Sequence, residues 1–176
     1  MKYFLLPVLL VILAPPASAG ESDWRTFTSE AGGFTVLLPG TPIFSDTTDH
    51  TVVGAVGENL YSLETAAASF SAEYSDLPGV ATFFESADSL YNDAREGLLK
   101  QTGARQTGYY GIEQESIRGK EITYEVPANR NSPLLHGKAR FLLRDKRLYV
   151  LVVTTPEMSD ADGIVSRYLD SFRLLK

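Results

Sequence analysis

The chain has 176 residues, no cysteine and a formal net charge of −6 at pH 7. The absence of cysteine excludes thiol catalysis, thiolate metal sites and disulfides, so stability must come from the packing of apolar side chains. An acidic chain without a run of Lys and Arg is also unsuited to nucleic acid, and we expect no nucleic-acid partner.

Residues 1–19 have the features of a secretory signal peptide. Lys2 supplies a positive start, residues 4–14 are apolar, and residues 17–19 form the small-residue cleavage pattern Ala-Ser-Ala. The apolar run is too short to span a bilayer, although an uncleaved anchor is the alternative. No cysteine follows for lipid attachment. We therefore expect cleavage after Ala19 and one domain over residues 20–176 without a membrane span, exported to the periplasm or the medium.

Short strands separated by turns are predicted in the first part of this domain. Residues 24–28 and 34–38 are the first two, divided by a Gly-containing turn. A long, half-exposed strand is expected over residues 44–56, where the sequence is polar and rich in Thr. A Gly-Glu-Asn turn at 57–59 would follow, and residues 60–74 alternate as one further strand.

Helical spacing of apolar side chains predicts two helices. The first covers residues 81–102, and Gly103 is its natural C-terminal stop. The second begins after Ser159, a good N-cap residue, and its apolar face extends to Phe172 before a tail at 172–175.

Between the helices, two strands are expected at residues 108–117 and 120–126, joined by an Arg-Gly turn at 118–119. Residues 127–133 are rich in Pro, Asn and Ser and are predicted to form a mobile loop.

The run from Gly137 to Thr155 is predicted to be the central hairpin, with Asp145 and Lys146 as its turn. Residues 148–155 are almost entirely apolar, β-branched or aromatic, which is typical of a strand covered on both faces. Neighbouring strands have connections of hairpin length. The element order therefore predicts an α+β fold, in which two main helices pack on a central antiparallel sheet.

The sequence contains no motif that assigns an enzymatic reaction. It has no Gly-x-Ser-x-Gly, P-loop or dinucleotide-binding motif, and we expect neither catalysis nor a cofactor. Its two histidines, His50 and His136, lack the spacing of metal ligands. The alternative is a metal site in which Asp46, Asp49 and His50 are the ligands. A second acidic group, for which helix capping is the favoured explanation, consists of Glu157, Asp160 and Asp162.

The candidate binding surface combines aromatic and basic side chains. Tyr109 and Tyr110, flanked by glycines, could line an exposed groove with Tyr124, or all three could serve as cross-strand packing. Arg140 and Arg144 share a strand face by parity and could contact a carboxylate or phosphate. The favoured alternative is pairing with glutamates of neighbouring strands, namely Glu113, Glu115, Glu121 or Glu125.

Several segments resemble the Mog1/PsbP-like superfamily, in particular its exported bacterial members of unknown function. The segments are residues 24–27 with 32–42, the hairpin pieces 139–141 and 147–149, and residues 168–172. The resemblance implies an α/β/α sandwich around an antiparallel sheet and a non-enzymatic binding or accessory role. It carries over no site residue, because the shared motifs are turn glycines, prolines and core aromatics.

These observations lead us to expect an exported, non-catalytic accessory or binding module that engages a protein or envelope partner. One alternative is a small-ligand or metal-binding protein that uses the tyrosine groove or the Asp49–His50 edge. Another is a hydrolase built from residues distant in sequence. An exposed apolar patch with aromatic anchors would support the binding module. A deep pocket with convergent polar groups would support the ligand- or metal-binding protein. A buried carboxylate of raised pKa in a cleft would support the hydrolase.

Overall fold

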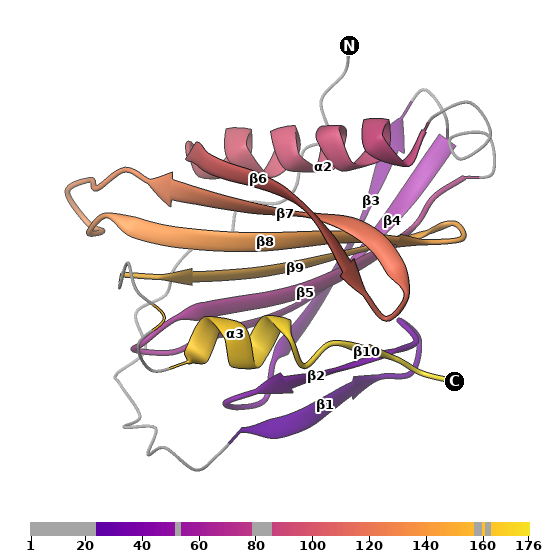
Figure 1. Cartoon of the computed structure of the whole chain (residues 1–176), viewed down its shortest axis with the longest axis horizontal. Coiled ribbons are helices and arrows are strands. Elements are labelled where there is room, and N and C mark those ends of the chain that lie inside the picture. The colour runs from indigo at the N-terminus through magenta and orange to yellow at the C-terminus, as the bar shows by residue number, and fades with distance from the viewer. Residues whose placement is uncertain (1–23, 52–53, 79–85, 157–159, 161–162) are drawn as a thin grey trace.

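The computed structural model describes residues 24–51, 54–78, 86–156, 160 and 163–176. The signal peptide expected at residues 1–19 lies outside these residues. In the described part the chain forms two antiparallel sheets and two helices (Figure 1), which confirms the predicted α+β class.

The larger sheet has seven strands, and each strand pairs antiparallel with its neighbours. Their spatial order is β3 (Ile43–Thr51), β4 (Gly54–Glu64), β5 (Ser69–Asp76), β9 (Arg147–Thr155), β8 (Leu135–Arg144), β7 (Ile117–Val126) and β6 (Arg105–Gln114).

The predicted hairpin is the centre of this sheet. Strand β9 is the fourth of the seven, and it pairs with β8 in a register that places Arg144 opposite Arg147. Asp145 in the turn has a φ of 56°, a left-handed conformation that Asp tolerates better than most residues. Side chains on both faces of the hairpin are buried, as the apolar run of β9 predicts.

The smaller sheet contains β1 (Arg25–Ser29), β2 (Phe34–Leu38) and β10 (Arg173–Leu174), with β2 in the middle. The tail predicted at 172–175 therefore contains a short strand that pairs with β2. Gly33, in the turn between β1 and β2, has a φ of 67°, which explains the need for glycine at this position.

Helix α2 (Ala87–Thr102) is shorter than predicted at its N-terminus. Ser86 is its N-cap, with an extended backbone and a side chain that accepts a hydrogen bond from the amide of Ser89. Residues 81–85 lie outside the described part. Gly103 ends the helix in the left-handed conformation, as predicted.

Helix α3 (Ile164–Leu169) is also shorter than predicted. Its N-cap is Gly163, and the nearby Asp160 carboxylate accepts hydrogen bonds from the amides of Val165 and Ser166. Phe172 lies beyond the helix but is fully buried in the core. Neither helix of the described part has the length and apolar content needed to cross a bilayer.

Two of the predicted turns are wrong in position, and one turn was not predicted. Residues 57–59 continue β4, because the Glu58 side chain is buried instead of marking a solvent-exposed turn. The single strand expected at 60–74 is divided between β4 and β5, because Thr65 closes a turn by accepting hydrogen bonds from the amides of Ala67 and Ala68. The turn between β6 and β7 is at Glu115–Ser116, where both residues have positive φ, and not at 118–119.

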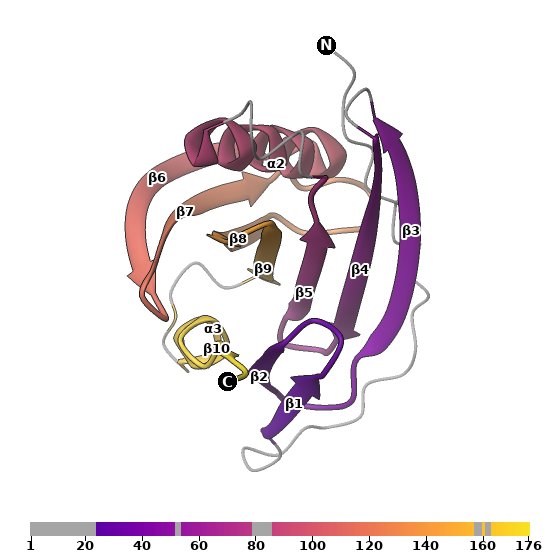
Figure 2. The same cartoon turned by 90° about the vertical axis from the view of Figure 1, so that its right-hand side faces the viewer.

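Two apolar clusters lie on opposite faces of the seven-stranded sheet. One lies beneath α2 and includes Leu90 and Phe141. The other is enclosed by α3 and the smaller sheet and includes Phe34, Tyr149 and Phe172. Figure 2 shows α2 on one side of the curved sheet and α3 with the smaller sheet on the other, so one of the two outer layers is part helix and part strand.

Candidate binding surface

The three tyrosines predicted to line a groove do not lie together on the surface. Tyr124 is 2% exposed, and its ring fills the space above Gly137. Burial raises the pKa of Tyr124 to about 12, and its hydroxyl lies 3.2 Å from Thr154 Oγ1. Tyr109 packs in the cluster beneath α2 and donates a hydrogen bond to Asn92. Tyr110 has the opposite orientation and is 55% exposed.

Arg140 forms internal contacts of the kind that we favoured from the sequence. Its Nε donates to Glu121 at 2.7 Å, in the directly opposite position on β7. Its Nη1 lies 2.8 Å from Asp170, just after α3, and 3.1 Å from Gln114 of β6. Arg140 thus connects the large sheet to the end of α3. Arg144 is different, because its side chain is 54% exposed and lies 3.8 Å from the adjacent Asp145.

Of the acidic residues considered for metal binding, the structure describes the side chains of Asp160 and Asp46. Burial acts to raise the pKa of Asp160, but hydrogen bonds from Ser166 and Val165 outweigh it and lower the pKa. This is the capping role expected from the sequence. The side chains of Asp49 and His50, and residues 157 and 162, lie outside the described part. Asp46 is exposed on β3.

An apolar surface that the sequence did not single out lies where β2 leads into β3. Ile43 and Phe44 are 74% and 49% exposed, an unusual degree of exposure for large apolar side chains that are adjacent in a strand. Phe44 packs on Tyr61 with a centroid distance of 5.0 Å, and Tyr61 packs on Phe27 at 4.8 Å. The row of rings holds Phe44 in place while leaving it accessible to solvent.

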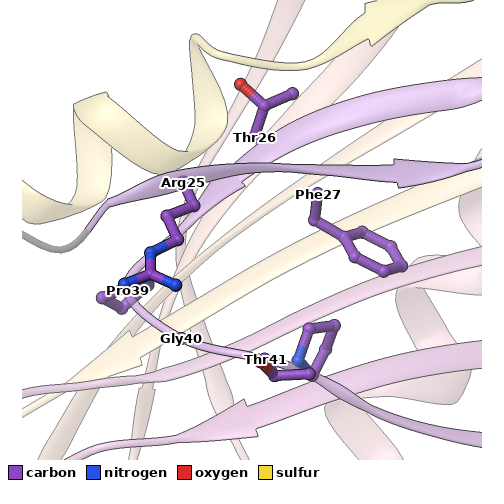
Figure 3. A pocket seen from close by; sticks show the side chains of 7 residues that line it. Arg25, Thr26, Phe27, Pro39, Gly40 and Thr41 are labelled. Atoms are coloured by element: carbon purple, nitrogen blue, oxygen red, sulfur yellow. The ribbon is translucent and has the colours of Figure 1, made fainter.

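A pocket of about 320 Å³ opens beside this row (Figure 3). Arg25 and Phe27 of β1 lie along one side of it, and the segment 39–42 that connects β2 to β3 completes it. Pro39 and Pro42 fix the backbone of this segment and give it an apolar surface. We use the name corner patch for Arg25, Phe27, Pro42, Ile43 and Phe44.

The corner patch adjoins an edge of the large sheet. Among the described strands only β4 pairs with β3, so the outer side of β3 presents backbone groups without a neighbouring strand. The β3 sequence, IFSDTTDHT, contains none of the Lys or Pro residues that commonly protect an edge, and its pairing with β4 has no bulge. The opposite edge strand, β6, contains a register shift between Gln106 and Gly108. The edge beside the patch therefore has no bulge, and the charged residues in its sequence are Asp46 and Asp49.

The sequence contained a signal for this surface. Ile43 and Phe44 are neighbours in a strand and must point to opposite faces, so burial of both would require a packed layer on each face of the sheet at this position. The sequence alone did not place this strand at an edge, and the signal was missed for that reason.

The sequence matches no family model and no curated protein. Among solved structures, the chain is similar to the cyanobacterial PsbP protein CyanoP from Synechocystis sp. PCC 6803. The TM-score is 0.58 at 15% identity, and the match covers 92% of this chain and 98% of CyanoP. A Pseudomonas aeruginosa protein of unknown function, PA94, matches with a TM-score of 0.42 at 13% identity, over 82% of this chain and 91% of that protein. The similarity to CyanoP shows that this chain has a PsbP-like fold, as its sequence segments predicted.

Proposed function

We propose that the protein is an exported, non-catalytic accessory module that binds a partner protein through the corner patch. The observation that carries this proposal is the exposure of Ile43 and Phe44 beside a pocket and an open strand edge. Export is supported by the signal-peptide features of residues 1–19.

The corner patch has the physical properties of a binding hot spot. Covering a large apolar side chain contributes about 1.5–3 kcal/mol when it becomes fully buried, and Ile43 and Phe44 both retain much of that area. Because Phe44 is held by Tyr61, little conformational entropy is lost when a partner covers it. The pocket beside it can accept one side chain of the partner, and Arg25 at the pocket wall can contact a polar group at the rim.

The position of the patch favours a partner segment in extended conformation. Such a segment can add to the outer side of β3 through main-chain hydrogen bonds, while its alternate side chains contact Ile43 on one face and Phe44 on the other. A second copy of this chain is a less suitable partner, because antiparallel pairing of two β3 strands would bring Asp46 and Asp49 of both copies close together.

The experiment is affinity capture from an envelope fraction with purified protein and two variants. Phe44→Ser removes the aromatic anchor, whereas Tyr110→Ser removes an exposed aromatic residue of similar size from the opposite edge strand. We expect the wild type and Tyr110→Ser to retain the same stoichiometric partner and Phe44→Ser to lose most of it. Equal capture by all three proteins would reject the corner patch as the binding surface.

A further inference from the structure

Positive charge is distributed unevenly along this chain. Between Arg25 and Arg95 the sequence contains no Lys or Arg, although ten of its 22 acidic residues fall in that interval, and 14 of its 16 Lys and Arg residues lie at 95–176. Strands β3, β4 and β5 belong to the first interval and β6 to β9 to the second. Because β3, β4 and β5 are neighbours in space (Figure 2), the large sheet has one acidic end, and its cations lie in the other strands.

The acidic end of the sheet is also the open edge beside the corner patch. Asp76, at the end of β5, is paired with Arg147 of the neighbouring β9, whose guanidinium lies 2.6 Å away. Asp46 and Asp49 of β3 have a different environment, because β4, the described strand that pairs with β3, contains no Lys or Arg. Arg25 lies at the pocket wall, next to the segment that precedes β3. The outer side of β3 therefore presents negative charge to an incoming strand.

Strand alternation places one of these acids on the same face as the aromatic anchor. Phe44 packs on Tyr61, which lies directly opposite it on β4, so its side chain projects toward the smaller sheet. Asp46 follows two residues later in an unbroken register and therefore projects from the same face, about 6–7 Å along the strand. Its side chain is exposed. An extended segment that pairs with β3 thus meets an apolar side chain and a carboxylate at alternate positions.

We propose that the segment added to β3 is basic, with an apolar side chain opposite Phe44 and a Lys or Arg two residues away, opposite Asp46. This inference rests on the proposed function and names the chemical class of the partner. Opposite charges directly across a strand pair stabilise the pairing, and like charges destabilise it. Main-chain hydrogen bonds are the same for every extended segment, so the charge at this position provides selectivity that they cannot provide.

The same arrangement predicts an order of affinity among segments. A Glu opposite Asp46 brings two carboxylates to directly facing positions, where Cβ atoms are about 4.5–5.5 Å apart. An uncharged side chain there gains only the main-chain and apolar contacts. The acidic end of the sheet also attracts cationic segments from solution, which increases the association rate at low salt. Lys should therefore be favoured over Gln, and Gln over Glu.

The test is titration of the purified protein with synthetic peptides of nine residues, the length of β3, followed by NMR of the β3 amides. The peptides share a host sequence rich in Thr and Val, with one Leu, and have Lys, Gln or Glu two residues from the Leu. A fourth peptide has the composition of the Lys peptide but places Leu and Lys next to each other, on opposite faces of the strand. We expect the Lys peptide to shift the β3 amides and to bind about tenfold more tightly than the Glu peptide. The fourth peptide should bind more weakly than the Lys peptide.

Charge reversal separates the local contact from the net charge of the protein. Asp46→Lys should invert the order, so that the Glu peptide binds best. Glu113→Lys makes the same change in net charge at an exposed glutamate of the opposite edge strand, and the Lys peptide should still bind best. Phe44→Ser should weaken binding of every peptide and keep the order.

The outcomes distinguish this inference from the proposed function. Equal affinity of the Lys and Glu peptides, or an unchanged order in Asp46→Lys, would overturn the basic segment while leaving the corner patch as a binding surface. If no peptide shifts the β3 amides, strand addition is overturned as well. Affinity capture with Phe44→Ser then decides separately whether the corner patch binds the partner.

Discussion

Arg140 and Arg144 lie on the same face of β8, but the structure predicts that only Arg140 matters for stability. In Arg140→Ala, the Glu121 carboxylate, whose side chain is 13% exposed in the intact pair, loses its closest cation. Lys138 remains 3.6 Å from Glu121 and offsets part of this loss. The contact with Asp170 contributes less, since that side chain is 64% exposed.

The size of the effect follows from these surroundings. Removing one partner of a fully buried ion pair costs about 3–5 kcal/mol, and the remaining Lys138 contact reduces this to about 2–3 kcal/mol of unfolding free energy. For a domain of this length the melting temperature should fall by roughly 5–10 °C. Arg144→Ala, the matched control, should change stability by less than about 0.5 kcal/mol because its side chain is exposed.

Urea denaturation followed by circular dichroism measures both variants under the same conditions. Equal unfolding free energies for Arg140→Ala and Arg144→Ala would refute the internal role that the structure gives to Arg140. If Arg140→Ala loses partner capture while its stability is unchanged, Arg140 contributes directly to partner binding.

Three further changes test the packing. Phe172→Ala should cost about 3–5 kcal/mol in urea denaturation, because Phe172 is fully buried and its ring lies 5.6 Å from that of Phe34; a loss below 1 kcal/mol would show that it is not a core residue. Gly137→Ala should cost about 1–3 kcal/mol, since a Cβ there would lie 2.1 Å from the Tyr124 ring, whereas Gly57→Ala, with open space around the added Cβ, should cost much less in the same assay. Ser86→Ala should remove about 1 kcal/mol of unfolding free energy by deleting the N-cap of α2, and an unchanged value would argue against that cap.

The central hairpin could be predicted from the sequence because its signal is local. An uninterrupted β-branched and aromatic run over residues 148–155 requires cover on both faces, and only an interior strand provides it. The body of α2 was predictable for a similar reason, since Leu90, Tyr91 and Leu98 recur at helical spacing and are all buried.

The misplaced turns show where local signals fail. The turn at Glu115–Ser116 contains neither Gly nor Asn, although both residues have positive φ, while Gly119 lies inside β7 and against the carbonyl of Phe141. Glycine was read as a turn former there, but its function is to allow close approach of two strands. The turn predicted at 57–59 was wrong for a different reason. A charged residue such as Glu58 is expected in an exposed turn, but its side chain is buried.

The candidate surface depended even more on tertiary structure. The sequence cannot show that Tyr124 covers Gly137 or that Tyr110 points away from it, because both facts depend on strand register. It also cannot show that β3 is an edge strand, which is the fact that leaves Ile43 and Phe44 exposed. Residue type identified aromatic candidates, and strand order determined which of them reach solvent.

The central claim is that a partner protein covers Phe44, and site-specific photo-crosslinking tests it most directly. A photoreactive amino acid at position 44, and separately at position 110 on the opposite edge, is activated in intact cells that express the full chain. The account predicts one discrete crosslinked partner from position 44 and none from position 110. A discrete product from position 110 with none from position 44 would contradict it.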